Sequence, residues 1–284
     1  MDTDAASVFW FVVPGVVVPA ALLVLAFRSP SARQLHRWAS GCGVRITDAN
    51  EDLVRSHLGR VRRFRSAAAF PFWWLATVPL VVGARLPTQL TTPMPALVAY
   101  VVGALVGELT ARPVASGPLK QASLEPRTVP DFRPGWSSVL PRATLVVAAV
   151  IVALSPGDDR PSRVAAITTL VVGLALVTAS ELATRHIVDR PQRSGDADVL
   201  AADDALRATA VAMTSAVAVL GGLAAFSWAV QAVTPAPTGW WAALSFVALI
   251  GCSGLGIGMM MTIVRQETWG YRRRHRQRTL AELS

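Results

Sequence analysis

Residues 164–181 read VAAITTLVVGLALVTASE. The stretch carries no charge before Glu181, and Arg163 and Arg185 lie on either side of it. A transmembrane helix needs about 20 mostly apolar residues to cross about 30 Å of hydrocarbon. Residues 164–181 therefore predict a membrane-spanning helix.

Six further stretches have a similar length and composition. The seven predicted spans are about 8–27, 68–84, 94–110, 139–155, 164–181, 208–230 and 240–264. Their Val-, Leu- and Ala-rich composition and their length favour bundled helices over a barrel. The chain is 52% hydrophobic and only 16% charged, whereas soluble domains carry roughly 25% charged residues. The sequence predicts an all-α polytopic membrane helix bundle that forms one transmembrane domain over residues 1–284.

The basic residues predict the orientation. All but three of the 27 Lys and Arg residues fall on one side of the predicted membrane, and the exceptions are Arg85, Arg160 and Arg163. Cytoplasmic loops of membrane proteins carry such an excess. We therefore predict an N-out, C-in protein of the cell inner (plasma) membrane, with inner segments at about 28–67, 111–138, 182–207 and 265–284. The same pattern explains the net charge of +9, so we expect no nucleic-acid partner.

The composition has a further bias, because Lys120 is the only lysine and Ala and Val are abundant. In this bias and in its layout the chain resembles uncharacterised actinobacterial multi-pass integral membrane proteins. The resemblance covers layout and composition only. It implies a multi-pass membrane protein and implies no activity.

The basic inner segment 28–67 contains a predicted amphipathic helix, Asp48–Arg65. Asp48 and Glu51 have the spacing of a helix N-cap and its partner. An apolar stripe at helical spacing consists of Val54, Leu58, Val61 and Phe64. The basic side chains that we expect to bind a partner or lipid are Arg55, Arg60, Arg62, Arg63 and Arg65. The pattern is typical of an interfacial helix on anionic inner-leaflet lipid, and the alternative is a docking helix for a cytoplasmic protein. The C-terminal tail, 265–284, is also basic.

Two of the predicted spans end alike. Gly107-Glu108-Leu109-Thr110-Ala111-Arg112 and Ser180-Glu181-Leu182-Ala183-Thr184-Arg185 both read small-Glu-Leu-x-x-Arg. After each inner segment the chain re-enters the membrane with Arg142 or Arg207, followed in both cases by Ala-Thr. The match predicts a parallel repeat of helical hairpins, spans 3–4 and 5–6.

This repeat predicts a charge network at the inner membrane edge, made of Glu108, Arg112, Arg142, Glu181, Arg185 and Arg207. Ionisable groups at this depth are costly and often mark ion or substrate paths. The alternative is that they are exposed pairs that anchor helix ends. We expect one hairpin to be tied by Glu108–Arg142 and its copy by Glu181–Arg207. Asp203 and Asp204 are expected to cap the start of span six.

Two small-xxx-small pairs, Gly103/Gly107 and Gly254/Gly258, favour close helix packing within the bundle or between protomers of a homo-oligomer.

No catalytic motif stands out in the sequence. CxxC, HExxH and His-rich tracts are absent, and no His-containing nucleophile arrangement lies at a common depth. We therefore expect no enzymatic activity, no metal site and no cofactor.

Two functions fit the features of this sequence. One is a non-enzymatic membrane component, an accessory or permease-like subunit that works with cytoplasmic partners. The other is a self-contained transporter or channel for an ion or small molecule that uses the membrane-edge charges.

Overall fold

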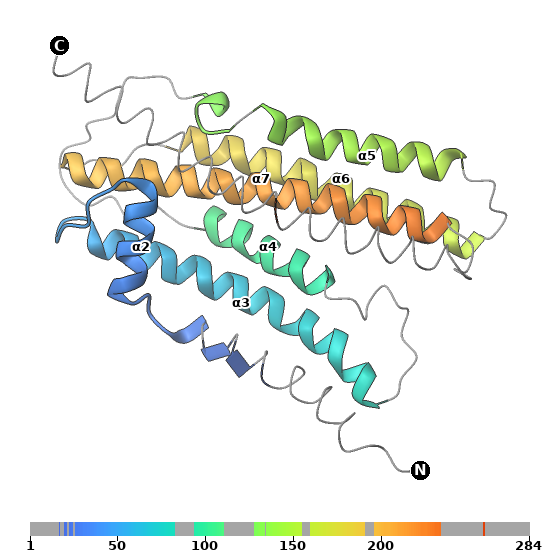
Figure 1. The fold of residues 1–284 in the computed structure, drawn as a ribbon, viewed down its shortest axis with the longest axis horizontal. Coiled ribbons are helices and arrows are strands. Elements are labelled where there is room, and N and C mark those ends of the chain that lie inside the picture. The colour runs from blue at the N-terminus through green and yellow to red at the C-terminus, as the bar shows by residue number, and fades with distance from the viewer. Residues whose placement is uncertain are drawn as a thin grey trace. The chain divides into compact units, whose positions relative to one another are not determined.

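The computed structural model describes residues 26–82, 94–110, 128–133, 135–154, 160–190 and 196–233, with a few single positions outside these ranges. Every regular element in them is helical (Figure 1). The elements are α2 (Ala32–Cys42), α3 (Glu51–Val82), α4 (Met94–Leu109), the short 3-10 helix η1 (Val129–Asp131), α5 (Trp136–Leu154), α6 (Arg160–Asp189) and α7 (Ala197–Val233). The all-α prediction is confirmed for this part of the chain.

Three helices are long and apolar enough to cross a membrane. They are Trp136–Leu154, which is the whole of α5, Ala166–Asp189 in α6 and Ala197–Ser227 in α7. They correspond to the fourth, fifth and sixth predicted spans. The second predicted span falls mostly in the second half of α3, and the third corresponds to α4. The first and seventh, 8–27 and 240–264, lie mostly outside the described residues, so the count of seven stays a prediction.

The chain divides into two compact units. The first unit contains residues 1–40 and 45–114, and the second contains residues 41–44 and 115–284. In the first unit α3 packs along α4, and in the second α7 packs against both α5 and α6. The predicted hairpin of spans 5–6 is therefore present as α6 and α7. The predicted hairpin of spans 3–4 stays a prediction, because α4 and α5 belong to different units.

The predicted amphipathic segment and the second predicted span form one continuous helix, α3, of 32 residues. If the second half of α3 crosses the membrane as predicted, the first half of the same continuous helix cannot lie in the membrane plane. The apolar stripe of this segment is also covered by protein, because Val54 and Val61 are buried and the backbone at Val61 lies against Gly107 of α4. The interpretation of residues 48–65 as an interfacial helix on lipid is therefore wrong.

The helix α3 also begins later than predicted, at Glu51. The buried side chain of Asn50 accepts a hydrogen bond from the Thr47 backbone N–H at 3.0 Å and donates one to the Arg45 carbonyl at 2.9 Å. A carboxylate cannot both accept and donate in this way. Asn50 therefore occupies the position before the helix, and Asp48 lies in the preceding turn.

The helix α2 ends in the manner expected of a glycine terminus. Gly43, the residue after Cys42, has φ of 72°. Glycine adopts this left-handed conformation without the steric cost that a Cβ would add. The chain can therefore turn sharply between α2 and the loop that leads to α3.

Two glycines of α4 set its close approach to α3. A Cβ placed on Gly103 would lie 2.4 Å from the Phe64 carbonyl oxygen and 2.6 Å from the Ala68 Cβ. A Cβ on Gly107 would lie 3.1 Å from the Val61 Cα. This small-xxx-small pair therefore packs two helices of the same chain. Of the other predicted pair, Gly254 lies outside the described residues and Gly258 is described without its neighbours.

We expect Gly103→Ala to destabilise the protein by about 1–3 kcal/mol, the usual range for overpacking a well-packed contact. The reason is that the added methyl group overlaps the backbone of α3, which cannot rotate away. The matched control is Gly41→Ala in α2, where nothing lies within 4 Å of the added Cβ. Thermal unfolding in detergent, followed by fluorescence-detected size exclusion, compares the two. Equal melting temperatures for both variants would contradict the close packing.

Candidate functional site

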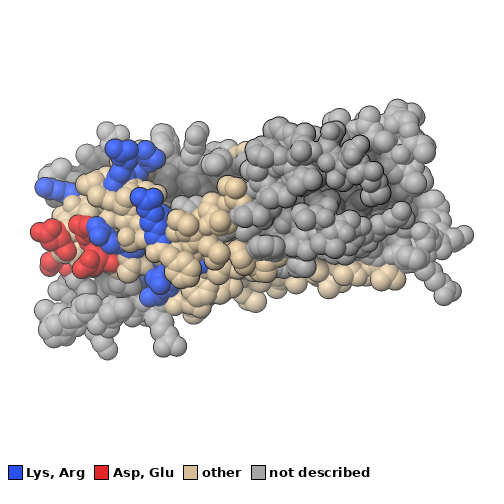
Figure 2. All heavy atoms as spheres, turned by 90° about the horizontal axis from the view of Figure 1, so that it is seen from below, with Lys and Arg blue, Asp and Glu red and all other residues tan. Residues whose placement is uncertain are grey.

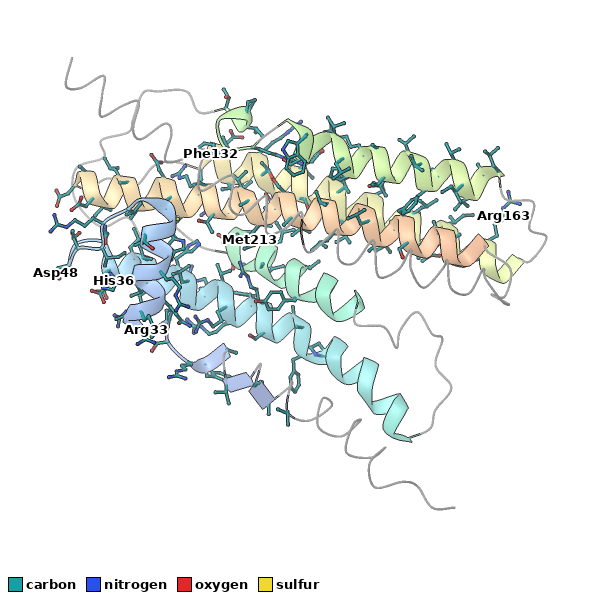
Figure 3. All side chains as sticks on the ribbon, viewed as in Figure 1. Arg33, His36, Asp48, Phe132, Arg163 and Met213 are labelled. Carbon is teal, nitrogen blue, oxygen red and sulfur yellow. The ribbon has the colours of Figure 1, made fainter. Side chains whose placement is uncertain are left out.

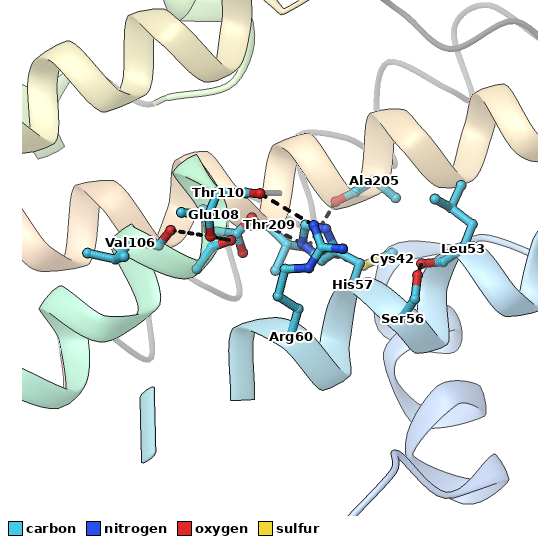
Figure 4. A network of polar contacts seen from close by, with 11 residues as sticks. Cys42, Leu53, Ser56, His57, Arg60, Val106, Glu108, Thr110, Ala205 and Thr209 are labelled. Carbon is cyan, nitrogen blue, oxygen red and sulfur yellow. Dashed lines mark hydrogen bonds and ion pairs between the residues drawn. The ribbon is translucent and has the colours of Figure 1, made fainter. Parts of the chain in front are cut away.

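Glu108, the first charge of the predicted network, is buried in the first unit and pairs with a histidine. His57 Nε2 on α3 lies 3.0 Å from Glu108 Oε2 on α4, and the side chains are 11% and 3% exposed (Figure 4). Beside this pair, Arg60 NH1 lies 3.4 Å from the Thr110 carbonyl oxygen. Arg60 thus donates to a carbonyl just beyond the end of α4, where helical carbonyls lack intrahelical partners. The two contacts join the end of α4 to α3.

His57 was not among the residues predicted from the sequence. It lies four residues before Val61 and seven before Phe64, so it continues the stripe that packs against α4. The helical spacing could have identified it, because a polar residue within an otherwise apolar, buried stripe needs a partner.

In the second unit, Arg142 of α5 pairs with Glu181 of α6. The Arg142 NH2 and Glu181 Oε1 atoms are 2.6 Å apart, and the side chains are 59% and 23% exposed. Because Arg142 pairs with Glu181, and Glu108 with His57, the predicted Glu108–Arg142 tie is wrong. The pairing joins α5 to α6, two helices that were predicted to belong to different hairpins.

Arg207 of α7 forms a second deeply buried charge pair, with Asp203. Its Nε and NH2 atoms donate to Asp203 Oδ2 at 3.0 and 2.8 Å, and the side chains are 4% and 11% exposed. Its NH1 donates to the Arg190 carbonyl oxygen just beyond the end of α6. The predicted Glu181–Arg207 tie is therefore wrong. Asp203 is also not a cap, because α7 already begins at Ala197.

Two hydroxyl groups link α6 to α7 in the interior of the second unit. The Oγ1 atoms of Thr184 and Thr214 are 2.7 Å apart, and both residues are buried. Interhelical hydroxyl contacts of this kind contribute to helix association in membranes. The α6–α7 hairpin is thus held by a polar contact as well as by apolar packing.

Four of the five arginines predicted to bind a partner or lipid make contacts inside the first unit. Arg55 pairs with Glu51, Arg60 donates to the Thr110 carbonyl, Arg62 NH2 donates to Gln34 Oε1 at 2.9 Å, and the Arg65 guanidinium lies 5.8 Å from the centre of the Tyr100 ring. Arg63 is exposed. Arg60, Arg62 and Arg65 therefore help to hold α2, α3 and α4 together, whereas the Arg55 pair lies within α3.

The amphipathic helix with an exposed basic face is α2, which the sequence analysis did not identify. Leu35, Ala39 and Cys42 are buried at helical spacing, whereas Arg33, His36 and Arg37 are exposed; Arg33 and His36 are labelled in Figure 3. On the face drawn in Figure 2, the charged side chains lie close together, with acidic and basic ones side by side. The i, i+4, i+7 spacing of the buried residues was the signal for this helix.

The two remaining members of the predicted network are Arg185 and Arg112. Arg185 is exposed on α6, and Arg112 lies outside the described residues. Within the described residues, no group of three or more His, Cys, Asp and Glu side chains lies close enough together to hold a metal ion. No protein-family model, no curated protein and no solved structure matches the chain.

Proposed function

We propose that the protein is a non-enzymatic integral membrane component, an accessory or permease-like subunit, whose inner end docks a cytoplasmic protein. The observation that carries the proposal is the length of α3. Its 32 residues correspond to about 48 Å at 1.5 Å per residue, about 18 Å more than the hydrocarbon core needs. A spanning α3 therefore projects beyond the membrane at its charged end.

The chemistry of the projecting end suits protein recognition. The first turn of α3 carries Glu51 and Asp52, and the helix then bears its arginines up to Arg65. The neighbouring α2 adds the exposed Arg33 and Arg37. The positive-inside pattern supports an inner location for this end. A folded, charged surface of two helices offers a partner a fixed docking site, which a flexible loop would not.

The test is purification from native membranes in mild detergent, with the copurifying proteins identified and their stoichiometry measured. We expect a stoichiometric cytoplasmic protein that is lost from the triple variant Arg33→Glu/Arg37→Glu/Arg63→Glu. Charge reversal on a docking surface replaces attraction by repulsion. The matched control is Arg163→Glu, an exposed arginine at the start of α6, which is expected to keep the partner. A single species with no stoichiometric partner in the wild-type preparation would refute the proposal.

The transporter or channel remains a second candidate, and the buried His57–Glu108 pair favours it. Ionisable groups within membrane helices often mark ion or substrate paths. In this case Glu108→Gln is expected to abolish flux in liposomes while the protein still folds. Glu181→Gln serves as the comparison, because Glu181 pairs with the more exposed Arg142.

A further inference from the structure

The helices of the second unit differ sharply in how much of their apolar surface is exposed. About 83% of the apolar window of α7 is buried, against 28% for each of α5 and α6. The large apolar side chains exposed on α5 and α6 include Val139, Val146, Leu154, Val171, Leu174 and Leu182. Helices of membrane length with exposed apolar faces suit contact with lipid, so α5 and α6 present a lipid-facing surface and α7 is the interior helix.

Two arginines lie within this apolar surface. Arg142 is 59% exposed and lies between the exposed Val139 and Val146, three and four residues away on α5. Arg185 is exposed and lies three residues after the exposed Leu182 on α6. Helical spacing places each arginine on the same face as its apolar neighbours.

Glu181 brings these two arginines into one cluster. It pairs with Arg142 across the α5–α6 contact and precedes Arg185 by one helical turn, so their Cβ atoms are about 5–6 Å apart. Among the residues that the structure describes, no ion pair is recorded between Arg185 and either Glu181 or the following acid on this face, Asp189. Arg142, Arg185 and Glu181 together carry one net positive charge, and the Asp189 carboxylate lies one helical turn beyond Arg185, on the side away from Glu181.

A net charge at the edge of the hydrocarbon region is costly unless a counterion neutralises it. A phosphodiester carries one negative charge and offers oxygens in the geometry that guanidinium groups bind. The apolar face that continues from the cluster along α5 and α6 is suited to acyl chains, which free phosphate lacks. Both features belong to a phospholipid. A headgroup without a cation of its own leaves the phosphate charge to be neutralised by the two guanidinium groups, which favours a phospholipid with a net negative charge.

We propose that Arg142 and Arg185 form a binding site for the phosphate of an anionic phospholipid, with its acyl chains along the exposed face of α5 and α6. Glu181 orients the Arg142 guanidinium and thereby fixes one half of the site. This inference rests on the membrane location of the helices and does not require the cytoplasmic partner proposed above. It differs from general attraction to anionic lipid, because it assigns the phosphate to two named side chains.

The test uses delipidated full-length protein in detergent, to which phosphatidylglycerol or phosphatidylcholine is added. Native mass spectrometry measures the affinity of bound lipid, and thermal unfolding measures stabilisation. We expect phosphatidylglycerol to bind more tightly than phosphatidylcholine, and Arg185→Gln to weaken phosphatidylglycerol binding by about fivefold, the effect of one basic residue at a lipid surface. Arg185→Gln leaves the Arg142–Glu181 pair intact, so its effect does not come from a broken ion pair.

Two controls make the result specific. Arg163→Gln removes an exposed arginine from the other end of α6 and is expected to bind phosphatidylglycerol like the wild type. Arg185→Lys keeps the charge and is expected to recover part of the affinity. Equal loss in Arg163→Gln and Arg185→Gln, or no loss in Arg185→Gln, would overturn the site. Stabilisation by millimolar inorganic phosphate equal to that by phosphatidylglycerol would also overturn it, because the acyl chains would then contribute nothing.

Discussion

The Arg207→Gln protein is expected to be less stable than the wild type by about 3–5 kcal/mol, the usual cost of breaking a buried charge pair from one side. Arg207 is 4% exposed and donates to Asp203 and to the Arg190 carbonyl. Glutamine cannot reach both acceptors, so the Asp203 carboxylate keeps its charge and loses this partner. The end of α6 also loses its link to α7. The measurement is the melting temperature in detergent, with recovery of monodisperse protein as a second readout.

The double variant Asp203→Asn/Arg207→Gln distinguishes the cost of leaving the Asp203 carboxylate unpaired from the cost of losing the Arg207 contact between α7 and the end of α6. It removes both charges, so it is expected to recover part of the stability that the single variant loses. Arg163→Gln is the matched surface control, since it changes an exposed arginine of α6 and is expected to leave the melting temperature within the small range of surface substitutions. If Arg207→Gln and Arg163→Gln melt at the same temperature, the buried pair does not stabilise the hairpin.

The long apolar helices were predictable because their signal is local. The stretches in α5, α6 and α7 are strongly apolar and carry at most two charged residues in their most apolar 18-residue window, and neither propensity nor packing opposes a helix there. The boundaries were less predictable. Span six was placed at 208–230, yet α7 begins at Ala197, because Asp198, Asp203 and Asp204 are polar and were assigned to a loop. Asp203 is tolerated inside the helix because Arg207, four residues later, neutralises it.

The pairing of charges was not predictable, because it depends on which helices are neighbours. The repeated Glu-Leu-x-x-Arg pattern suggested equivalent partners for Glu108 and Glu181. In the structure Glu108 faces His57 and Glu181 faces Arg142. Similar local sequences thus acquire different partners when one helix packs on α3 and the other on α5. The spacing of Gly103 and Gly107 indicated that α4 packs closely on another helix. It did not identify that helix as α3.

The basic segment 28–67 shows a different kind of error. The stripe Val54 to Phe64 was recognised correctly as the apolar face of a helix, but lipid was taken as what covers it. A hydrophobic stripe has the same spacing whether protein or lipid covers it. Only the glycines of α4, which allow a second helix to approach, show that protein covers this face.

The second large effect is expected at Glu108. Glu108→Ala should lower the free energy of unfolding by about 3–5 kcal/mol, because it removes a buried partner of His57 and leaves a cavity between α3 and α4. Glu108→Gln should cost only about 1 kcal/mol, because the amide oxygen can still accept a hydrogen bond from His57 Nε2. Thermal unfolding of both variants against the wild type tests this order.

A double-mutant cycle with His57→Ala assigns the loss to the pair itself. If the 3.0 Å contact stabilises the α3–α4 packing, the cost of Glu108→Ala should be smaller in a His57→Ala background, with a coupling of about 0.5–3 kcal/mol. Simple additivity would mean that the two side chains act independently and would remove this pair from the candidate site. Together with flux measured in liposomes, the cycle also distinguishes the two functions considered for the protein. A large coupling with unchanged flux makes the pair a packing element of a docking subunit, whereas loss of flux in the well-folded Glu108→Gln variant makes it part of a transport path.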